Sequence, residues 1–216
     1  MSLRPPSGRL LLELDEPAVC SADRRAHRRS TAQPLRWLVP YDPLTESLRL
    51  LEHGVPEAPV RLSRRRRFAA LAADVDGDVA CTLFVVRGAG HFRREAHALV
   101  RRDGTWARLG GGGAGSDTDG LTDRPTPEVL GHPVVVEGSG SVSLNADRRM
   151  PWGARHLRFA ELLASSAVHT VQVADRVLVV PRHGHLVVVR ATRRPPAAVA
   201  RAADGERVCA VPLAAP

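Results

Sequence analysis

The clearest fold signal in this chain of 216 residues is the stretch FRREAHALVRRDGTWARL, residues 92–109. Its first ten residues form a β-favouring run, and Trp106 to Leu109 form a second, shorter one. Between the two runs, Asp103 and Gly104 are typical of a two-residue turn in which both residues take a positive φ. The stretch therefore predicts an antiparallel hairpin with its turn at residues 102–105.

Similar short segments surround the hairpin and continue to the end of the chain. A near-continuous run of β-formers occupies residues 79–87, just before the hairpin. We expect further strands at 133–137, 141–144, 156–164, 168–173, 177–180, 185–190, 198–202 and 207–211, with turns at 138–140, 174–175 and 204–205. Residues 156–164 also fit a helical period, so a helix stays open there. The near-regular spacing predicts a mainly β fold, most simply an antiparallel β-sandwich, with a barrel as the alternative.

One or two short helices are expected before the strands. Asp42 can cap a helix, Pro43 suits its first position and Gly54 suits its exit, which predicts a helix over 43–53. Residues 63–73 favour a second helix. Four arginines at its start would oppose the helix macrodipole, so a loop or a strand is an open alternative there.

The chain divides into three regions on this pattern. Residues 1–36 are expected to be poorly ordered or to form an edge strand, and residues 37–74 to form a short helical region packed on the core. Residues 75–216 would form the antiparallel β domain, with a Gly/Asp-rich loop at 110–127. This loop is interpreted as a connector rather than a phosphate-binding loop, because the chain has no lysine to complete that motif.

Charge and cysteine usage set the expected partners and location. The net charge is +8 and every one of the 31 basic residues is arginine, which favours anionic partners. Acidic residues are spread along the whole chain, so nucleic acid is an alternative but not the favoured partner. The three cysteines lie far apart, no long apolar run is present, and we expect no signal peptide. We therefore expect a cytoplasmic protein with no membrane partner.

Two groups of side chains are candidate sites. The densest positive cluster is Arg64, Arg65, Arg66 and Arg67, for which we expect contact with an anionic partner rather than only a solvated face. His183 and His185 would lie on the same side of an extended chain, so they are candidate metal ligands. No carboxylate follows them closely. The expected cofactor is therefore none, with a divalent metal as the alternative.

No ordered catalytic motif appears, so no catalytic residue is expected. The favoured function is a non-catalytic binding or interaction module of unknown specificity, for a protein or other anionic partner. One alternative is a metal-dependent β-barrel enzyme centred on His183 and His185, and a second is nucleic-acid binding through the arginine clusters. Exposed strand edges make a homodimer a plausible assembly.

Overall fold

A computed structural model describes residues 41–56, 61–145 and 155–213. All of them belong to one compact unit, Trp37–Pro216. The poorly ordered segment or edge strand predicted within 1–36 lies outside the described residues. Within the described part of the chain, no helix is long and apolar enough to cross a membrane.

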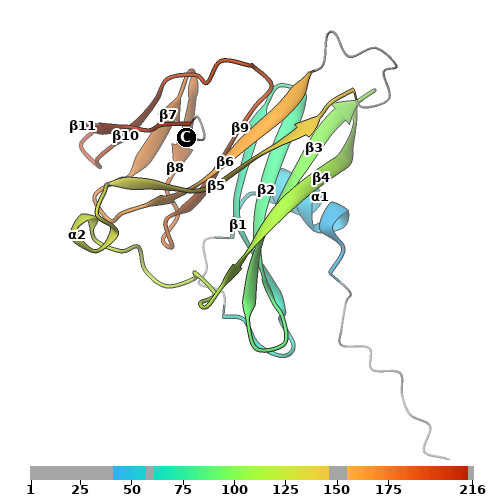
Figure 1. The fold of residues 1–216 in the computed structure, drawn as a ribbon, viewed down its shortest axis with the longest axis horizontal. Coiled ribbons are helices and arrows are strands. Elements are labelled where there is room, and N and C mark those ends of the chain that lie inside the picture. Colours follow the sequence, from blue (N-terminus) through green and yellow to red (C-terminus); the bar gives the residue numbers. More distant parts are fainter. Residues whose placement is uncertain (1–40, 57–60, 146–154, 214–216) are drawn as a thin grey trace, which may run out of the picture. The chain divides into compact units, whose positions relative to one another are not determined.

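Two short helices and eleven strands make up the described residues (Figure 1). The helices are α1 (Pro43–His53) and α2 (Pro127–Leu130). The strands are β1 (Phe68–Asp76), β2 (Val79–Arg87), β3 (Phe92–Arg102), β4 (Thr105–Ser116), β5 (Val134–Ser143), β6 (His156–Ala164), β7 (Thr170–Val173), β8 (Arg176–Val179), β9 (His185–Arg190), β10 (Ala198–Arg201) and β11 (Arg207–Ala210). Every strand pair among them is antiparallel, and no sheet closes into a barrel. The predicted mainly β, sandwich-like fold is confirmed.

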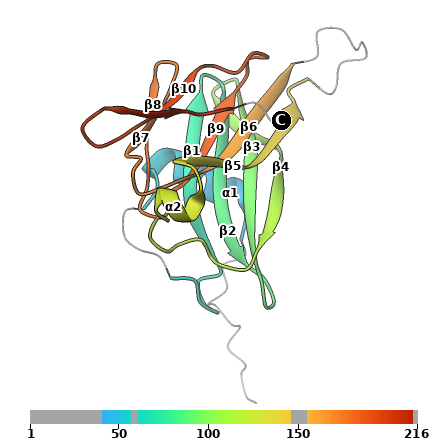
Figure 2. The same cartoon turned by 60° about the vertical axis from the view of Figure 1, so that its left-hand side comes forward.

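The strands form three sheets (Figures 1 and 2), and strands β6 and β9 of the middle one are largely buried. The sheet orders are β1-β2-β3-β4, β5-β6-β9 and β11-β10-β7-β8. Leu157 and Val187 of the middle sheet join the core against β1–β4, whereas Leu162 and Val188 join the core against the third sheet. Burial on both faces explains why β6 and β9 read as nearly continuous apolar runs instead of alternating ones.

Helix α1 packs on the outer face of the β1–β4 sheet, as its sequence pattern predicts. The Asp42 carboxylate caps it by accepting the Thr45 backbone N–H at 3.0 Å, and Gly54 ends it with a φ of 76°. Leu50 and Ser47 are buried against the sheet. The predicted helix over 43–53 is confirmed at both ends.

The predicted hairpin forms between β3 and β4. Asp103 and Gly104 both have positive φ angles, 50° and 80°, as the two-residue turn requires. The strands stay paired from Arg102–Thr105 to Phe92–Ser116, with one register shift after Ala98.

The glycine-rich stretch is a strand up to Ser116, so the loop predicted at 110–127 begins later than expected. Gly110 to Gly115 pair with β3, and a Cβ at Gly111 would lie only 2.1 Å from the Ala96 carbonyl oxygen. Backbone pairing with a strong neighbouring strand overcomes the low β propensity of glycine.

Three other local predictions differ from the structure. The second helix predicted over 63–73 is instead a turn followed by β1, the strand alternative that the arginines favoured. The turn predicted at 138–140 lies inside β5, which has a register shift between Val136 and Gly138. The helix alternative for 156–164 is wrong, since that segment is β6, paired on both sides.

Candidate functional site

Three arginines line a surface pocket beside the turn between β2 and β3. The arginine pocket, as we call it, consists of Arg64, Arg67, Arg87 and residues 88–90, and its volume is about 420 Å³. No carboxylate belongs to its described lining. The pocket is therefore strongly positive and open to a ligand from solvent.

Hydrogen bonds form the turn that contains Arg64 and place Arg67 beside Arg87. The Ser63 hydroxyl accepts the backbone N–H groups of Arg65 and Arg66, at 3.2 and 3.0 Å, and so forms a turn just before β1. Arg67 is paired with Arg87 across the strands, since the Arg87 N–H donates to the Arg67 carbonyl at 2.6 Å. The Arg67 guanidinium donates back to the Arg87 carbonyl at 3.3 Å. The two guanidinium-bearing residues are thus fixed side by side.

The tight turn after β2 forms the rest of the pocket lining. The Gly88 N–H donates to the His91 carbonyl at 2.8 Å, and Gly90 has a φ of 83°. The His91 ring lies against Gly88, where a Cβ would come within 2.8 Å of it. Small residues at this turn leave the mouth of the pocket unobstructed.

The pocket arginines have no acidic partner within the described residues. None of the ion pairs there includes Arg64, Arg67 or Arg87. Other arginines of the fold are paired, for example Arg176 with Asp74. Neighbouring unpaired guanidinium groups repel one another, and a bound anion would relieve that repulsion through charge-assisted hydrogen bonds.

The structure distributes the predicted arginine cluster over different sites. Arg64 and Arg67 line the arginine pocket, whereas Arg66 lines a separate depression beside α1, and Arg65 lines neither of these two pockets. Arg87 is a pocket residue that the sequence analysis missed. Its signal is its position, the last residue of a predicted strand directly before the sequence Gly-Ala-Gly.

The predicted metal ligands lie close together and have polar contacts with each other and with Glu137. The His183 and His185 rings are 5.7 Å apart between centroids, and the His185 N–H donates to His183 Nδ1 at 3.2 Å. His185 Nδ1 lies 3.1 Å from Glu137 Oε2. Burial, with the charges of His185 and Arg124, lowers the pKa of His183 to about 4. Within 41–56, 61–145 and 155–213, no group of three or more His, Cys, Asp or Glu residues could hold a metal.

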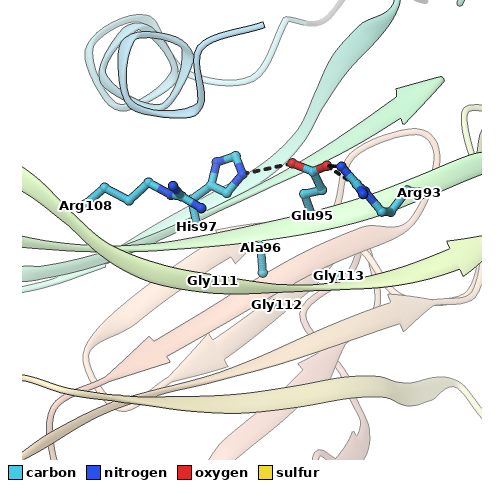
Figure 3. Close-up of a pocket in the computed structure, with 8 residues that line it drawn as sticks. All are labelled: Arg93, Glu95, Ala96, His97, Arg108, Gly111, Gly112 and Gly113. Atoms are coloured by element: carbon cyan, nitrogen blue, oxygen red, sulfur yellow. Dashed lines mark hydrogen bonds and ion pairs between the residues drawn. The ribbon is translucent and has the colours of Figure 1, made fainter. Parts of the chain in front are cut away.

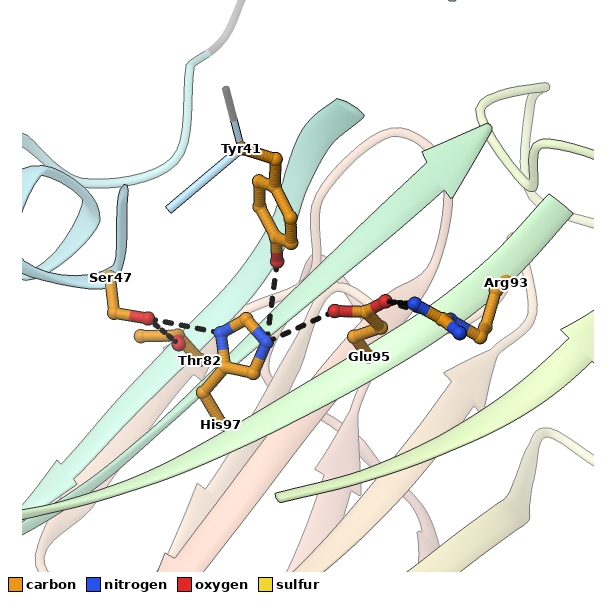
Figure 4. A network of polar contacts seen from close by, with 6 residues as sticks. All are labelled: Tyr41, Ser47, Thr82, Arg93, Glu95 and His97. Carbon is orange, nitrogen blue, oxygen red and sulfur yellow. Dashed lines mark hydrogen bonds and ion pairs between the residues drawn. The ribbon is translucent and has the colours of Figure 1, made fainter. Parts of the chain in front are cut away.

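A buried polar network connects α1 to the outer face of the β1–β4 sheet (Figure 4). His97 Nδ1 lies 3.2 Å from Ser47 Oγ, and its Nε2 lies 3.3 Å from Glu95 Oε2. These contacts join a serine, a histidine and an acid, as in a catalytic triad, but with the roles of the two ring nitrogens exchanged. Ser47 is 0% exposed, however, and also bonds to Thr82 Oγ1 at 2.7 Å, so no substrate can reach its hydroxyl. The network fixes the helix to the sheet.

A cleft of about 350 Å³ lies beside this network (Figure 3). Arg93, Glu95, His97 and Arg108 line it above the bare backbone of Gly111 to Gly113. Glu95 pairs with Arg93 and contributes negative charge. This cleft therefore attracts an anion less strongly than the arginine pocket does. Burial is the main cause that lowers the pKa of His97, which favours its neutral form.

Comparison with known proteins gives no family for this chain. No family model matches it, and no curated protein and no solved structure matches it either.

Proposed function

We propose that this chain is a non-catalytic binding module that holds an anionic group of a partner in the arginine pocket. The observation that carries the proposal is the gathering of Arg64, Arg67 and Arg87 in one pocket whose described lining has no carboxylate. The net charge of +8 adds long-range attraction for such a partner.

The chemistry of the lining supports binding rather than turnover. Arginine stays protonated in proteins, so it is a poor general acid or base, and residues 88–90 contribute only glycine and alanine. Among the described residues that line it, the pocket thus has donors for an anion but no side chain that acts as a nucleophile or a general base. Guanidinium groups suit the paired oxygens of a carboxylate or a phosphate.

The favoured partner is an acidic protein segment. Three guanidinium groups around one pocket match a few neighbouring carboxylates or one phosphorylated side chain. Nucleic acid would instead need basic contacts repeated along a groove.

Fluorescence anisotropy with a labelled oligoglutamate peptide tests the proposal. The triple variant Arg64→Ser, Arg67→Ser and Arg87→Ser should bind about tenfold more weakly than the wild type, with a smaller salt dependence. The control is the triple variant Arg193→Ser, Arg194→Ser and Arg207→Ser, which removes the same charge from exposed positions elsewhere. Its affinity should stay within about twofold of the wild type.

Equal weakening in both triple variants would mean that net charge alone attracts the peptide, and the proposal would be wrong. A labelled single-stranded oligonucleotide serves as the second probe. Should it bind far more tightly than the peptide, and lose that affinity only in the pocket variant, the nucleic-acid alternative would replace the protein partner.

A further inference from the structure

A second cavity, of about 220 Å³, lies between β4, β5 and β6. We call it the glutamate cavity, because Glu137 and Glu161 are the charged side chains of its described lining. Phe159 lines it as well, and most of the remaining wall is glycine, serine or alanine. In a chain with a net charge of +8, this cavity is locally acidic.

Missing side chains create the cavity. Gly138 and Gly140 of β5 pair with Glu161 and Phe159 of β6. A Cβ at Gly140 would come within 2.4 Å of the Phe159 ring, and one at Gly138 would lie 3.5 Å from the Glu161 carboxyl carbon. Gly112 of β4 leaves space on the other side, since its Cβ would lie 3.7 Å from the same ring. Glycine on β4 and β5 therefore lets both backbones pack closely on the Phe159 ring, and Gly138 leaves the Glu161 carboxyl group at the cavity wall.

Glu161 is the glutamate of the cavity for which no described residue provides a hydrogen bond. It is 8% exposed, and it accepts no hydrogen bond from any described residue. Burial raises its pKa, with Glu137 of β5 adding to the effect and Arg94 of β3 and His185 of β9 opposing it. A buried carboxyl group without a partner is rare because its desolvation is uncompensated.

Glu137 differs from Glu161 because two side chains of the protein, Arg94 and His185, already interact with its carboxylate. Arg94 Nη1 and His185 Nδ1 both contact Glu137 Oε2, the latter at 3.1 Å. Burial alone would raise the pKa of Glu137, but these two partners outweigh it and lower the value to about 2. Glu137 is therefore ionised and paired, which leaves Glu161 as the group able to anchor a ligand.

We propose that the glutamate cavity binds a small organic cation, with its ammonium group held by Glu161 and packed against Phe159. A carboxylate supplies a charge-assisted acceptor, and an aromatic face attracts a cation by its quadrupole. An anion is disfavoured, because both acidic side chains line the cavity and no arginine, lysine or histidine belongs to its described lining. The site shares no residue with the arginine pocket, so the two proposals stand or fall separately.

Calorimetric titration with choline and with butylammonium tests this site. Each cation is compared with a neutral analogue of similar shape, dimethylbutanol for choline and butanol for butylammonium. The wild type should bind at least one cation measurably and its neutral analogue about tenfold more weakly. Glu161→Gln should reduce the affinity for that cation by about tenfold, because the charge is lost while the shape is kept.

Two further variants complete the experiment. Glu206→Gln removes the same charge from an exposed position and should leave the affinity unchanged. Phe159→Leu should weaken the cation more than its neutral analogue. The proposal is overturned if neither cation binds better than its analogue, or if Glu161→Gln binds as tightly as the wild type. Circular dichroism of each variant confirms that the comparison is between folded proteins.

Discussion

The Asp74 carboxylate and the Arg176 guanidinium form a pair that connects three sheets. Arg176 Nη1 lies 2.6 Å from both Asp74 oxygens, and the Val189 N–H donates to one of them at 2.8 Å. Arg176 Nη2 in turn donates to the Val189 carbonyl at 3.0 Å. Asp74 lies on β1, Arg176 on β8 and Val189 on β9, so each sheet contributes one residue.

Replacing Asp74 should destabilise the fold severely. Asp74→Ala leaves a half-buried guanidinium and a buried N–H without their acceptor, so we expect a loss of about 3 kcal/mol in the free energy of unfolding. Urea denaturation measures it. Asp78→Ala is the control, because that side chain is 73% exposed and its pair with Arg101 is weak. Similar midpoints for the two variants would show that the Asp74 pair does not hold the sheets together.

The turn of the β3–β4 hairpin should depend on its glycine. Gly104 has a φ of 80°, which a β-branched residue adopts only with strain. We expect Gly104→Val to cost on the order of 1 kcal/mol or more, and Thr105→Val, one residue further along, to cost little. The denaturant midpoints of the two variants decide the matter, and an unchanged midpoint for Gly104→Val would mean that the turn is wrongly assigned.

Two glycines of β4 should respond in opposite ways to alanine. A Cβ at Gly111 would clash with the Ala96 carbonyl at 2.1 Å, whereas a Cβ at Gly115 would meet nothing within 4 Å. Gly111→Ala should therefore cost about 3 kcal/mol, and Gly115→Ala should be neutral or slightly stabilising. Thermal unfolding of both variants measures the difference. If both are tolerated equally, the stretch is not the tightly paired strand described above.

Local sequence patterns were sufficient to predict most of the strands, because turn residues mark the strand ends. Asp103-Gly104 and Asp204-Gly205 each lie at a turn with positive-φ glycine, and the strands beside them begin and end within a few residues of the prediction. The loop predicted to begin at residue 110 was wrong over the glycine stretch for a physical reason. Its pairing with β3 is a non-local interaction, and the identity of the glycines carries no sign of that partner.

The candidate sites were less visible in the sequence than the fold. A run such as Arg64 to Arg67 is visible in the sequence as a dense positive charge. The position of Arg87 beside Arg67, however, depends on strand pairing between residues 20 positions apart. The glutamate cavity depends on register, because Gly138 must face Glu161 for the carboxyl group to be uncovered. Composition could not reveal either arrangement.

The stability of the fold should depend on pH in opposite directions through the two glutamates of the cavity, Glu137 and Glu161. The pKa of Glu137 is lower in the folded chain than in the unfolded chain, so its pairing stabilises the fold above pH 4.5 and is lost as the pH falls toward about 2. The advantage of the wild type over Glu137→Gln should therefore shrink in that range. The pKa of Glu161 is raised, so its ionisation destabilises the ligand-free fold as the pH rises above the ordinary value.

Glu161→Gln should accordingly gain stability relative to the wild type as the pH rises above 4.5, the ordinary pKa of a glutamate. Urea denaturation of the wild type and both variants at several pH values measures both trends. If the difference in the free energy of unfolding between the wild type and Glu161→Gln does not change with pH, the raised pKa of Glu161 is contradicted.

The Asp74–Val189 hydrogen bond also has a consequence for the order of folding. Strands β1 to β4 pair only with their neighbours along the chain, so this sheet can form from local encounters. The bond to Val189 spans 115 positions and requires closure of a long loop. We expect the four-stranded sheet to assemble early and β9 to dock after the rate-limiting step, so that replacing Asp74 accelerates unfolding much more than it slows folding.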